Sequence, residues 1–526
     1  MTNHAGPADP LHDRIDTGIG SYPRYPGLWH FDAVGLAAPA PCPGGGAAAR
    51  AEGGSAVAQW RAAARIVDET GRRTRIALID TPVARDHPCL AGTLMRDLAI
   101  DFALNPPLPP GEPAPRDPAA RAEAIRDRVR EYAGRIDDGE CLPQSRFPGS
   151  HGTSMAGIIG AHPALATLYR PERLGRGGAP SDAAAAMAMP LPYAGLDPTC
   201  QILPVSISAW PGPHELFAAL EYALLREADL IVIATDLPNP FARDAAESAE
   251  DALKTSTAEF RERPHFLPAT EPFWAVLTRR LGEISERVPI LCAAGNAADE
   301  FAYPARLSAI HPGIFAVGAV NSLGAWTSYS PQAGVTLAAP SGDAERWDRA
   351  ETPRLDVYRH DFGKDEEEPY RSGLFPYEKM PVPVLVATDI PGKHGYNGSR
   401  FEAVRLQGRA GPDRGEIRDI AVDGAAVTLP HETDPALAAL VRRQTGLAVY
   451  LDFAANFCLF SGTSAATSVA AGLISLGLST GVLPRDLCPA SLRRALEAEL
   501  PKEGPPALNW DNLSRAARHI CPRDTA

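Results

Sequence analysis

Apolar runs of strand length alternate along the chain with segments that have the spacing of amphipathic helices. Strands are predicted at 75–80, 201–208, 229–235, 288–294 and 314–320. Helices are predicted at 56–69, 118–133, 213–226 and 272–286, and two more begin near His151 and Ser464. Runs that are apolar throughout are typical of strands buried on both faces, so the order predicts a parallel sheet covered by helices on both sides. The predicted fold class is α/β, a three-layer α/β/α arrangement around a mostly parallel sheet.

Segments without this alternation lie at the start of the chain and between the predicted elements. Residues 1–55 are rich in Pro, Gly and Ala, so we predict an irregular N-terminal extension. Its Tyr22–Pro26 stretch favours an extended backbone that suits a regulatory strap in a cleft, and a surface wrap without that role is the alternative. Insertions are predicted where connections are too long, near 239–271, 343–382 and 398–447, with short strands in the last. A helical C-terminal tail is predicted at 488–520.

The composition argues against several classes of protein. The chain has 526 residues, 45% of them hydrophobic, and its net charge of −13 argues against a nucleic-acid-binding surface. No apolar run reaches the ~18 residues of a membrane span, and the N-terminus lacks the features of a signal peptide, so we expect a cytoplasmic protein. The eight cysteines include no Cys-x-x-Cys pair and are expected to be reduced, with four disulfides as the alternative.

Three polar residues stand at the edges of apolar elements, in the order acid, histidine, serine. Asp80 ends a predicted buried strand, and His151 opens a predicted helix. Ser464 lies in the first turn of another predicted helix, where backbone N–H groups and the positive helix end can stabilise an oxyanion. Each residue alone has a structural alternative, as a capping residue at a turn or helix end. The order of all three favours a nucleophilic active site.

Seven further segments lie in a characteristic order along the chain relative to these three residues. They are Gly195–Val205, Pro289–Asn296, Tyr303–Ala305, Phe315–Val320, Leu337–Pro340, Ala387–Gly392 and Gly395–Asn397. Together with the Asp80, His151 and Ser464 motifs they resemble the subtilisin-like (subtilase) serine peptidases, which have the acid, the histidine and the serine in this order. The resemblance spans roughly residues 74–480. It implies one subtilisin-like peptidase domain, residues 56–526, that carries the insertions.

The resemblance also implies a role for each site residue. Ser464 would attack the scissile carbonyl, His151 would take its proton, and Asp80 would orient the imidazole. The side-chain amide of Asn296 and the backbone N–H of Ser464 would donate to the oxyanion. The implied function is a serine endopeptidase that works through an acyl-enzyme and needs no cofactor for the chemistry. Subtilases often bind structural calcium, and no ligands for it can be assigned in this sequence.

The sequence departs from the family pattern near the predicted cleft. Ser468 stands where the family usually has proline, and Thr81-Pro82 follows the acid in place of Thr/Ser-Gly. The substrate is expected to lie as an extended strand beside residues 231–236. Its predicted binding residues are Ala234, Thr235, Asp236, Cys292, Ala293, Ala294 and Gly295. Asp236 replaces a glycine of the cleft strand, which predicts a preference for Arg or Lys in the substrate unless the carboxylate points to solvent.

Two other functions remain open at this stage. One is a peptidase-fold interaction protein in which the triad is present and the cleft is blocked. The other is a transpeptidase or peptide-maturation enzyme of the same fold, in which an amine replaces water at the acyl-enzyme. The expected partners are a protein or peptide substrate and, as an open alternative, a regulatory partner; nucleic acid and membrane are not expected.

Overall fold

The structure is a computed structural model. It describes residues 29–36, 55–85, 88–108, 114–145, 150–162, 165–169, 186–190, 194–208, 211–235, 273–296, 301–321, 324–341, 382–387, 405–410, 417–422, 425–427, 449–452, 455–460 and 462–520.

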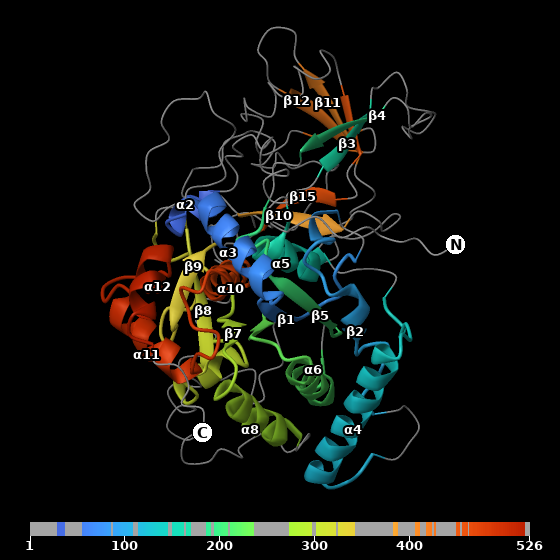
Figure 1. Ribbon diagram of the computed structural model, residues 1–526, viewed down its shortest axis with the longest axis vertical. Helices are drawn as coiled ribbons and strands as arrows, with labels where there is room; N and C mark the ends of the chain where they lie inside the picture. The colour runs from blue at the N-terminus through green and yellow to red at the C-terminus, as the bar shows by residue number, and fades with distance from the viewer. Residues whose placement is uncertain are drawn as a thin grey trace, which may run out of the picture.

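A seven-stranded sheet forms the centre of the molecule, and all its strands are parallel (Figure 1). In spatial order the strands are β2 (Ile100–Asp101), β5 (Gln201–Ser206), β1 (Arg75–Asp80), β6 (Leu230–Ile233), β7 (Ile290–Ala293), β8 (Ile314–Val320) and β9 (Leu337–Pro340). The sheet confirms the predicted α/β fold class. Every strand is almost wholly buried, which explains why their sequences are apolar runs without alternation.

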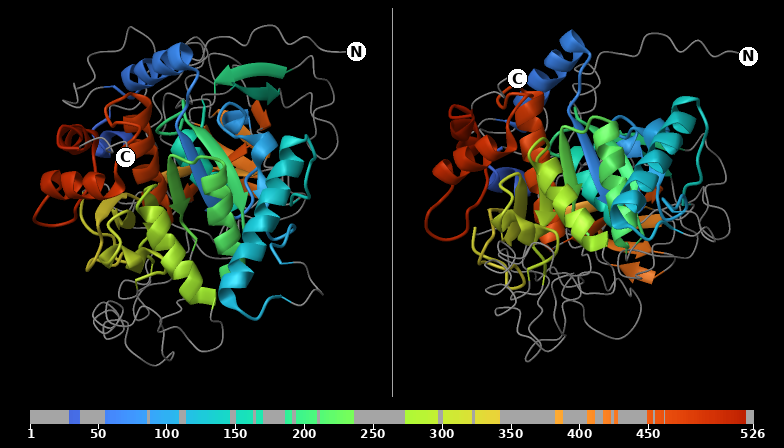
Figure 2. Two further views of the ribbon diagram at one scale, coloured as in Figure 1. Left: turned by 60° about the horizontal axis from the view of Figure 1, so that its bottom comes forward. Right: turned by 90° about the horizontal axis from the view of Figure 1, so that it is seen from below.

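Helices cover both faces of this sheet. One face carries α3 (Ala56–Thr70), α5 (Ser150–Gly160), α10 (Thr463–Ser479), α11 (Pro489–Glu499) and α12 (Trp510–Ala517). The other carries α4 (Pro118–Asp137), α6 (Pro213–Leu225) and α8 (Phe273–Ser285), which lie side by side in Figure 2. Alternate residues of β1 belong to different cores: Ile76 and Leu78 pack with the first group of helices, and Ala77 and Ile79 with the second.

The helix boundaries follow from local capping chemistry. The Asp117 carboxylate accepts a hydrogen bond from Ala120 N at 2.8 Å, and Pro118 occupies the first position of α4. At the start of α12, Asn509 and Asn512 form a reciprocal capping box. These side chains satisfy backbone N–H groups that have no acceptor inside the helix.

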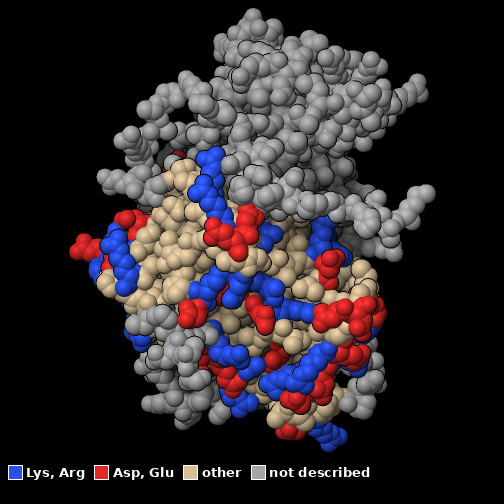
Figure 3. All heavy atoms as spheres, viewed as in Figure 1, with Lys and Arg blue, Asp and Glu red and all other residues tan. Residues whose placement is uncertain are grey.

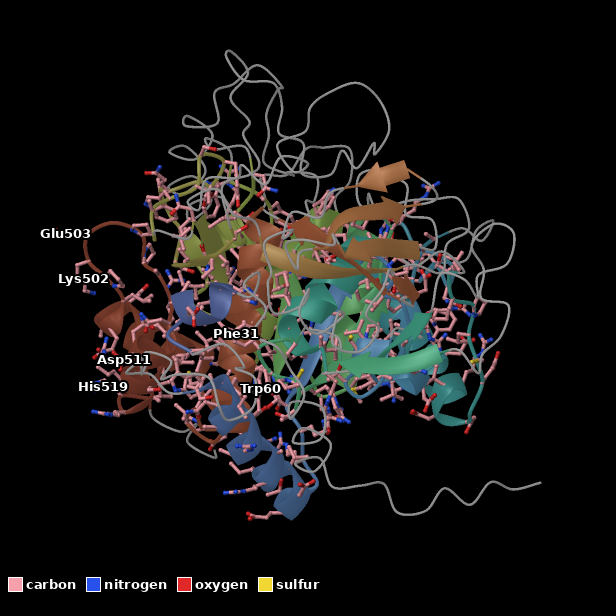
Figure 4. All side chains as sticks on the ribbon, turned by 90° about the horizontal axis from the view of Figure 1, so that it is seen from above. Phe31, Trp60, Lys502, Glu503, Asp511 and His519 are labelled. Atoms are coloured by element: carbon pink, nitrogen blue, oxygen red, sulfur yellow. The ribbon has the colours of Figure 1, made fainter. Side chains whose placement is uncertain are left out.

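Within the predicted N-terminal extension, the structure describes residues 29–36. Residues 29–33 form α2 (Trp29–Ala33), and the Phe31 ring packs edge-on against Trp60 of α3 at 5.9 Å (Figure 4). The carbonyl of Val34 accepts a hydrogen bond from Trp510 N at 2.8 Å. This segment therefore packs onto the helices of the main sheet, because its aromatic and aliphatic side chains complete one core. The Tyr22–Pro26 strap lies outside the described residues.

Antiparallel strands form two further sheets. A six-stranded sheet has the order β13 (Ala425–Val427), β12 (Ile417–Val422), β11 (Arg405–Ala410), β14 (Val449–Asp452), β3 (Leu165–Tyr169) and β4 (Ala186–Pro190). A two-stranded sheet pairs β10 (Val382–Ala387) with β15 (Ala455–Phe460). Three of these strands lie in the predicted insertion at 398–447, whereas β3 and β4 were not predicted. The predicted insertion at 239–271 lies outside the described residues, as does that at 343–382 except for Val382.

The described surface mixes charges of both signs. In Figure 3, acidic and basic side chains are interspersed over the described part of the visible face. Exposed ion pairs along α4 are an example, with Arg128–Glu131 at 2.8 Å and Arg130–Asp127 at 2.6 Å. None of the helices in the described ranges has the length and apolar character needed to cross a membrane.

Candidate active site

The carboxyl ends of β1, β6 and β7 lie next to one another at one edge of the main sheet. Ile79 pairs with Ile233, and Ile233 pairs with Cys292 on its other side. Asp80, which ends β1, and Ala234, which follows β6, therefore come at the same level. In parallel α/β sheets this edge is where ligands bind.

Asp80 and His151 form a buried hydrogen bond at this edge. The distance from Asp80 Oδ1 to His151 Nδ1 is 2.7 Å, and the two residues are 1% and 3% exposed. Asp80 Oδ1 also accepts from Thr81 N at 2.7 Å and Thr81 Oγ1 at 3.1 Å. An ionised carboxylate can only accept, so Nδ1 carries the proton and Nε2 is the nitrogen available as a base. The arrangement fixes both the tautomer and the direction of the imidazole.

Thr81 also ties the end of β1 to the first turn of α5. Gly152 N donates to Thr81 Oγ1 at 3.0 Å. A Cβ atom at position 152 would lie 2.1 Å from the carbonyl oxygen of Thr81, so only glycine permits this approach. His151 is therefore held against Asp80 by the packing of its own helix as well as by its side chain.

Ser464 lies in the first turn of α10, which packs against α5. Ser468 Oγ lies 3.2 Å from Met155 Sδ, and these residues come four positions after Ser464 and His151. The two helices therefore touch one turn beyond Ser464 and His151. The Ser464 hydroxyl donates to the carbonyl of Ala234 at 2.9 Å.

Asn296 follows β7 and is bonded to the residue before Ser464. Asn296 Oδ1 accepts from Thr463 N at 2.7 Å and from Thr463 Oγ1 at 3.0 Å, and Gly295 N donates to Thr463 Oγ1 at 3.1 Å. With Oδ1 held by Thr463, Nδ2 has no protein acceptor within the described part of the chain. The side chain thus keeps its two N–H donors free beside the start of α10, as an oxyanion site requires.

The predicted substrate-binding residues differ in exposure. Thr235, Ala293 and Gly295 are half-buried at the sheet edge. Cys292 and Ala294 are fully buried in the core on the α8 side, because successive side chains of a strand point to opposite faces. Their assignment to substrate binding, with Cys292 lining or backing the pocket, stays a prediction. Asp236 lies outside the described residues, so its proposed effect on specificity stays a prediction.

Two residues of the site were missed by sequence reasoning. Thr81 and Thr463 stand next to Asp80 and Ser464 in the chain, and that position was the only available signal. Their hydrogen bonds to Asp80 and Asn296 become visible only when β1, β7, α5 and α10 are assembled.

No metal centre accompanies these residues in the described ranges, where no three His, Cys, Asp or Glu side chains converge. A structural calcium site stays a proposal without assigned ligands.

The sequence model of the subtilase family (Peptidase_S8) matches residues 71–364, which is more than half of the chain. The chain belongs to the subtilase family. It is therefore a serine peptidase of that family. The matched region contains Asp80, His151 and Asn296, whereas Ser464 lies beyond it and is related to them by the packing of α10. None of the curated proteins matches the chain in sequence.

Several solved proteases are similar to this subtilase. The nisin leader peptidase NisP from Lactococcus lactis is 13% identical over 86% of this chain and 90% of its own, with a TM-score of 0.43. The prenylagaramide maturation protease PagA is 16% identical over 88% of this chain and 99% of its own, with a TM-score of 0.37. A serine protease of Aeromonas sobria is 14% identical over all of this chain and 70% of its own, with a TM-score of 0.41.

Proposed function

We propose that this subtilase is an endopeptidase that cleaves peptide bonds through a triad of Asp80, His151 and Ser464. The hydrogen bond of 2.7 Å between Asp80 and His151 carries the proposal, because it prepares the imidazole to act as a base. The packing of α5 against α10 supports the third member, since the two helices touch one turn beyond His151 and Ser464.

Acylation begins when the Ser464 hydroxyl turns from Ala234 O towards His151. Nε2 takes the proton while Oγ forms a bond to the carbonyl carbon of the scissile peptide. The negative charge on the carbonyl oxygen then accepts hydrogen bonds from Asn296 Nδ2 and from the backbone N–H of Ser464. This N–H lies in the first turn of α10, where backbone donors have no acceptor within the helix.

Collapse of the tetrahedral intermediate breaks the C–N bond. The imidazolium gives its proton to the leaving amine, and the acyl group stays on Ser464. A water molecule repeats the attack with His151 as the base, which frees the carboxylic acid and restores the hydroxyl. Asp80 stays ionised throughout and stabilises the imidazolium.

The substrate in this proposal is an extended stretch of polypeptide. The carbonyl of Ala234, which holds the Ser464 hydroxyl in this structure, lies at the end of β6 where a substrate N–H can replace that hydroxyl. Substrate binding would then release the nucleophile towards His151. Specificity for basic residues, a regulatory partner and a cytoplasmic location are further parts of the proposal.

An activity-based probe and a peptide library test this function together. The wild-type protein should react with a fluorophosphonate at Ser464 and cleave peptides at internal bonds, and Ser464→Ala should do neither. Ser468→Ala is a matched control, because it removes a buried hydroxyl one turn further along the same helix and should keep activity.

The products separate the competing functions. Incorporation of an added amine in place of water would identify a transpeptidase. Failure of folded wild-type protein to react with the probe would exclude the endopeptidase proposal and favour an interaction protein with a blocked cleft.

A further inference from the structure

Gly462 sets the course of the chain into the nucleophile-bearing helix. It precedes α10 with φ of +99° and ψ of 160°, a conformation that is accessible to glycine and strained for other residues. Its carbonyl accepts hydrogen bonds from Ala465 N at 3.1 Å and Ala466 N at 3.4 Å. Any rotation of the peptide groups around Gly462 would therefore move the backbone N–H and the side chain of Ser464.

A closed ring of hydrogen bonds holds both backbone polar groups of Gly462. Gly462 N donates to Tyr329 Oη at 2.9 Å, Tyr329 Oη donates to Ser341 Oγ at 2.8 Å, and Ser341 Oγ donates to Gly462 O at 2.7 Å. Tyr329 and Ser341 are both 0% exposed. Each hydroxyl donates once and accepts once in the same sense around the ring, an arrangement in which hydrogen bonds strengthen one another.

The two hydroxyl-bearing residues are themselves anchored to the main sheet. Ser341 directly follows β9, and its backbone N–H donates to Val320 O of β8 at 2.8 Å. Ser330, which follows Tyr329, accepts a hydrogen bond from Ala319 N of β8 at 3.0 Å. The ring therefore connects the turn before Ser464 to the buried main sheet.

We propose that Tyr329 and Ser341 are positioning residues for the peptidase reaction. They touch neither substrate nor reacting atoms, and they act by fixing the Gly462 peptide groups so that Ser464 presents its hydroxyl and its N–H in the geometry of the transition state. This inference rests on the proposed endopeptidase function. Loss of the ring should weaken stabilisation of the oxyanion and leave ground-state substrate binding unchanged, because only the transition state uses the Ser464 N–H.

Two conservative substitutions open the ring and keep the packing. Tyr329→Phe removes the phenol hydroxyl, and Ser341→Ala removes the serine hydroxyl. Each should lower kcat by about tenfold with KM unchanged, and should slow fluorophosphonate labelling of Ser464 by a similar factor. The double variant should be little worse than either single one, because a break at any point opens the same ring.

Matched controls lose a buried hydroxyl elsewhere. Tyr222→Phe removes a hydrogen bond of 2.7 Å to Leu98 O, and Ser285→Ala removes one of 2.7 Å to Gly282 O. Both residues are almost fully buried and lie on α6 and α8, on the other face of the sheet. These variants should lower the melting temperature as the ring variants do, while keeping the wild-type kcat at temperatures where all proteins are folded.

The outcomes distinguish this inference from the proposed function. A wild-type kcat in folded Tyr329→Phe or Ser341→Ala, or an equal loss of kcat in the controls, would overturn the positioning role. A wild-type protein that neither reacts with the probe nor cleaves peptides would instead overturn the endopeptidase function. If one of the two ring variants fails to fold, the other still tests the positioning role, because it opens the same ring of hydrogen bonds.

Discussion

Asp80 Oδ1 accepts three hydrogen bonds, from His151 Nδ1 and from the backbone and hydroxyl of Thr81. These donors fix the direction of the carboxylate and leave one orientation for the imidazole. Asn296 is held in a comparable way, since both bonds to its Oδ1 come from Thr463. At this scale the site is a set of side chains oriented by hydrogen bonds, and the bonds to Asn296 and His151 come from residues distant in the chain.

Loss of a triad member should abolish peptide hydrolysis without unfolding the protein. We expect Ser464→Ala and His151→Ala each to lower kcat by about 10⁴-fold or more, with the double variant little worse, because triad members act as a unit. Steady-state kinetics and far-UV circular dichroism measure the two parts of this prediction. Undiminished turnover in purified Ser464→Ala would contradict it.

Asn296→Ala should remove one oxyanion donor. A decrease in kcat of about 10²–10³-fold with a nearly unchanged KM is expected, since the donor acts on the transition state. Asn509→Ala, which removes the amide that caps α12, is the control and should affect stability in preference to kcat. A large rise in KM in Asn296→Ala would point to a role in substrate binding instead.

Asp236→Asn tests the predicted specificity. If the carboxylate contacts the substrate, kcat/KM for peptides with Arg or Lys should fall several-fold, and neutral peptides should be nearly unaffected. An equal loss on both classes of peptide, or no loss on either, would rule out this role of Asp236.

At the scale of elements, α2 closes one end of the core that contains α3 and α12. Phe31 and Val34 are fully buried, and Trp510 N donates to Val34 O. His30 on the same helix is 0% exposed, and neither of its ring nitrogens has a hydrogen-bond partner in the described part of the chain. Burial lowers the pKa of His30 from 6.5 to about 3, so the helix is packed around a neutral imidazole.

This burial predicts that acid destabilises the fold through His30. The folded-state pKa lies below the unfolded one, so the unfolded state binds the extra proton as the pH falls below 6.5, and stability is lost down to about pH 3. The free energy of unfolding of the wild type should fall when the pH is lowered from about 7 to about 5. In His30→Leu this loss should be smaller by about 2 kcal/mol, because the protonation of residue 30 no longer contributes. Urea titrations at both pH values measure this difference.

His519→Leu is the control for the loss of an exposed histidine. The side chain of His519 is 61% exposed on the surface after α12. An identical pH dependence in the wild type and His30→Leu would show that His30 does not contribute to acid destabilisation.

At the scale of the whole molecule, the described cysteines are not joined to one another by disulfides. Among the cysteines in the described ranges, Cys89, Cys141, Cys200, Cys292 and Cys488 form no disulfide, and only Cys141 of these is exposed. Burial raises the pKa of the Cys89, Cys200 and Cys292 thiols, which keeps them protonated and unreactive.

Alkylation of native protein should therefore be selective. Iodoacetamide should label Cys141 before Cys89, Cys200 or Cys292, and unfolding in urea should make all of them reactive. Peptide mapping by mass spectrometry gives the order of labelling. A native protein with four disulfides, seen as an eight-proton mass gain on reduction, would contradict the expectation of reduced cysteines.

The sequence alone determined the order of the main strands and helices and nominated Asp80, His151, Ser464 and Asn296. Both results depend on local information, namely the period of the apolar residues and short motifs next to element ends. The C-terminal helices α11 and α12 were found in the same way. The short helix α2 was not predicted, because a five-residue helix has too few turns to show a period.

Only the tertiary structure decided which of these segments meet. Tyr329 and Ser341 carry no motif, and they reach Gly462 across 133 and 121 residues of chain. The burial of Cys292 depends on which face of β7 meets α8. Strand order and the packing of α5 against α10 likewise depend on contacts between distant parts of the chain. These contacts form only when the whole core is assembled, so they leave no local pattern in the sequence.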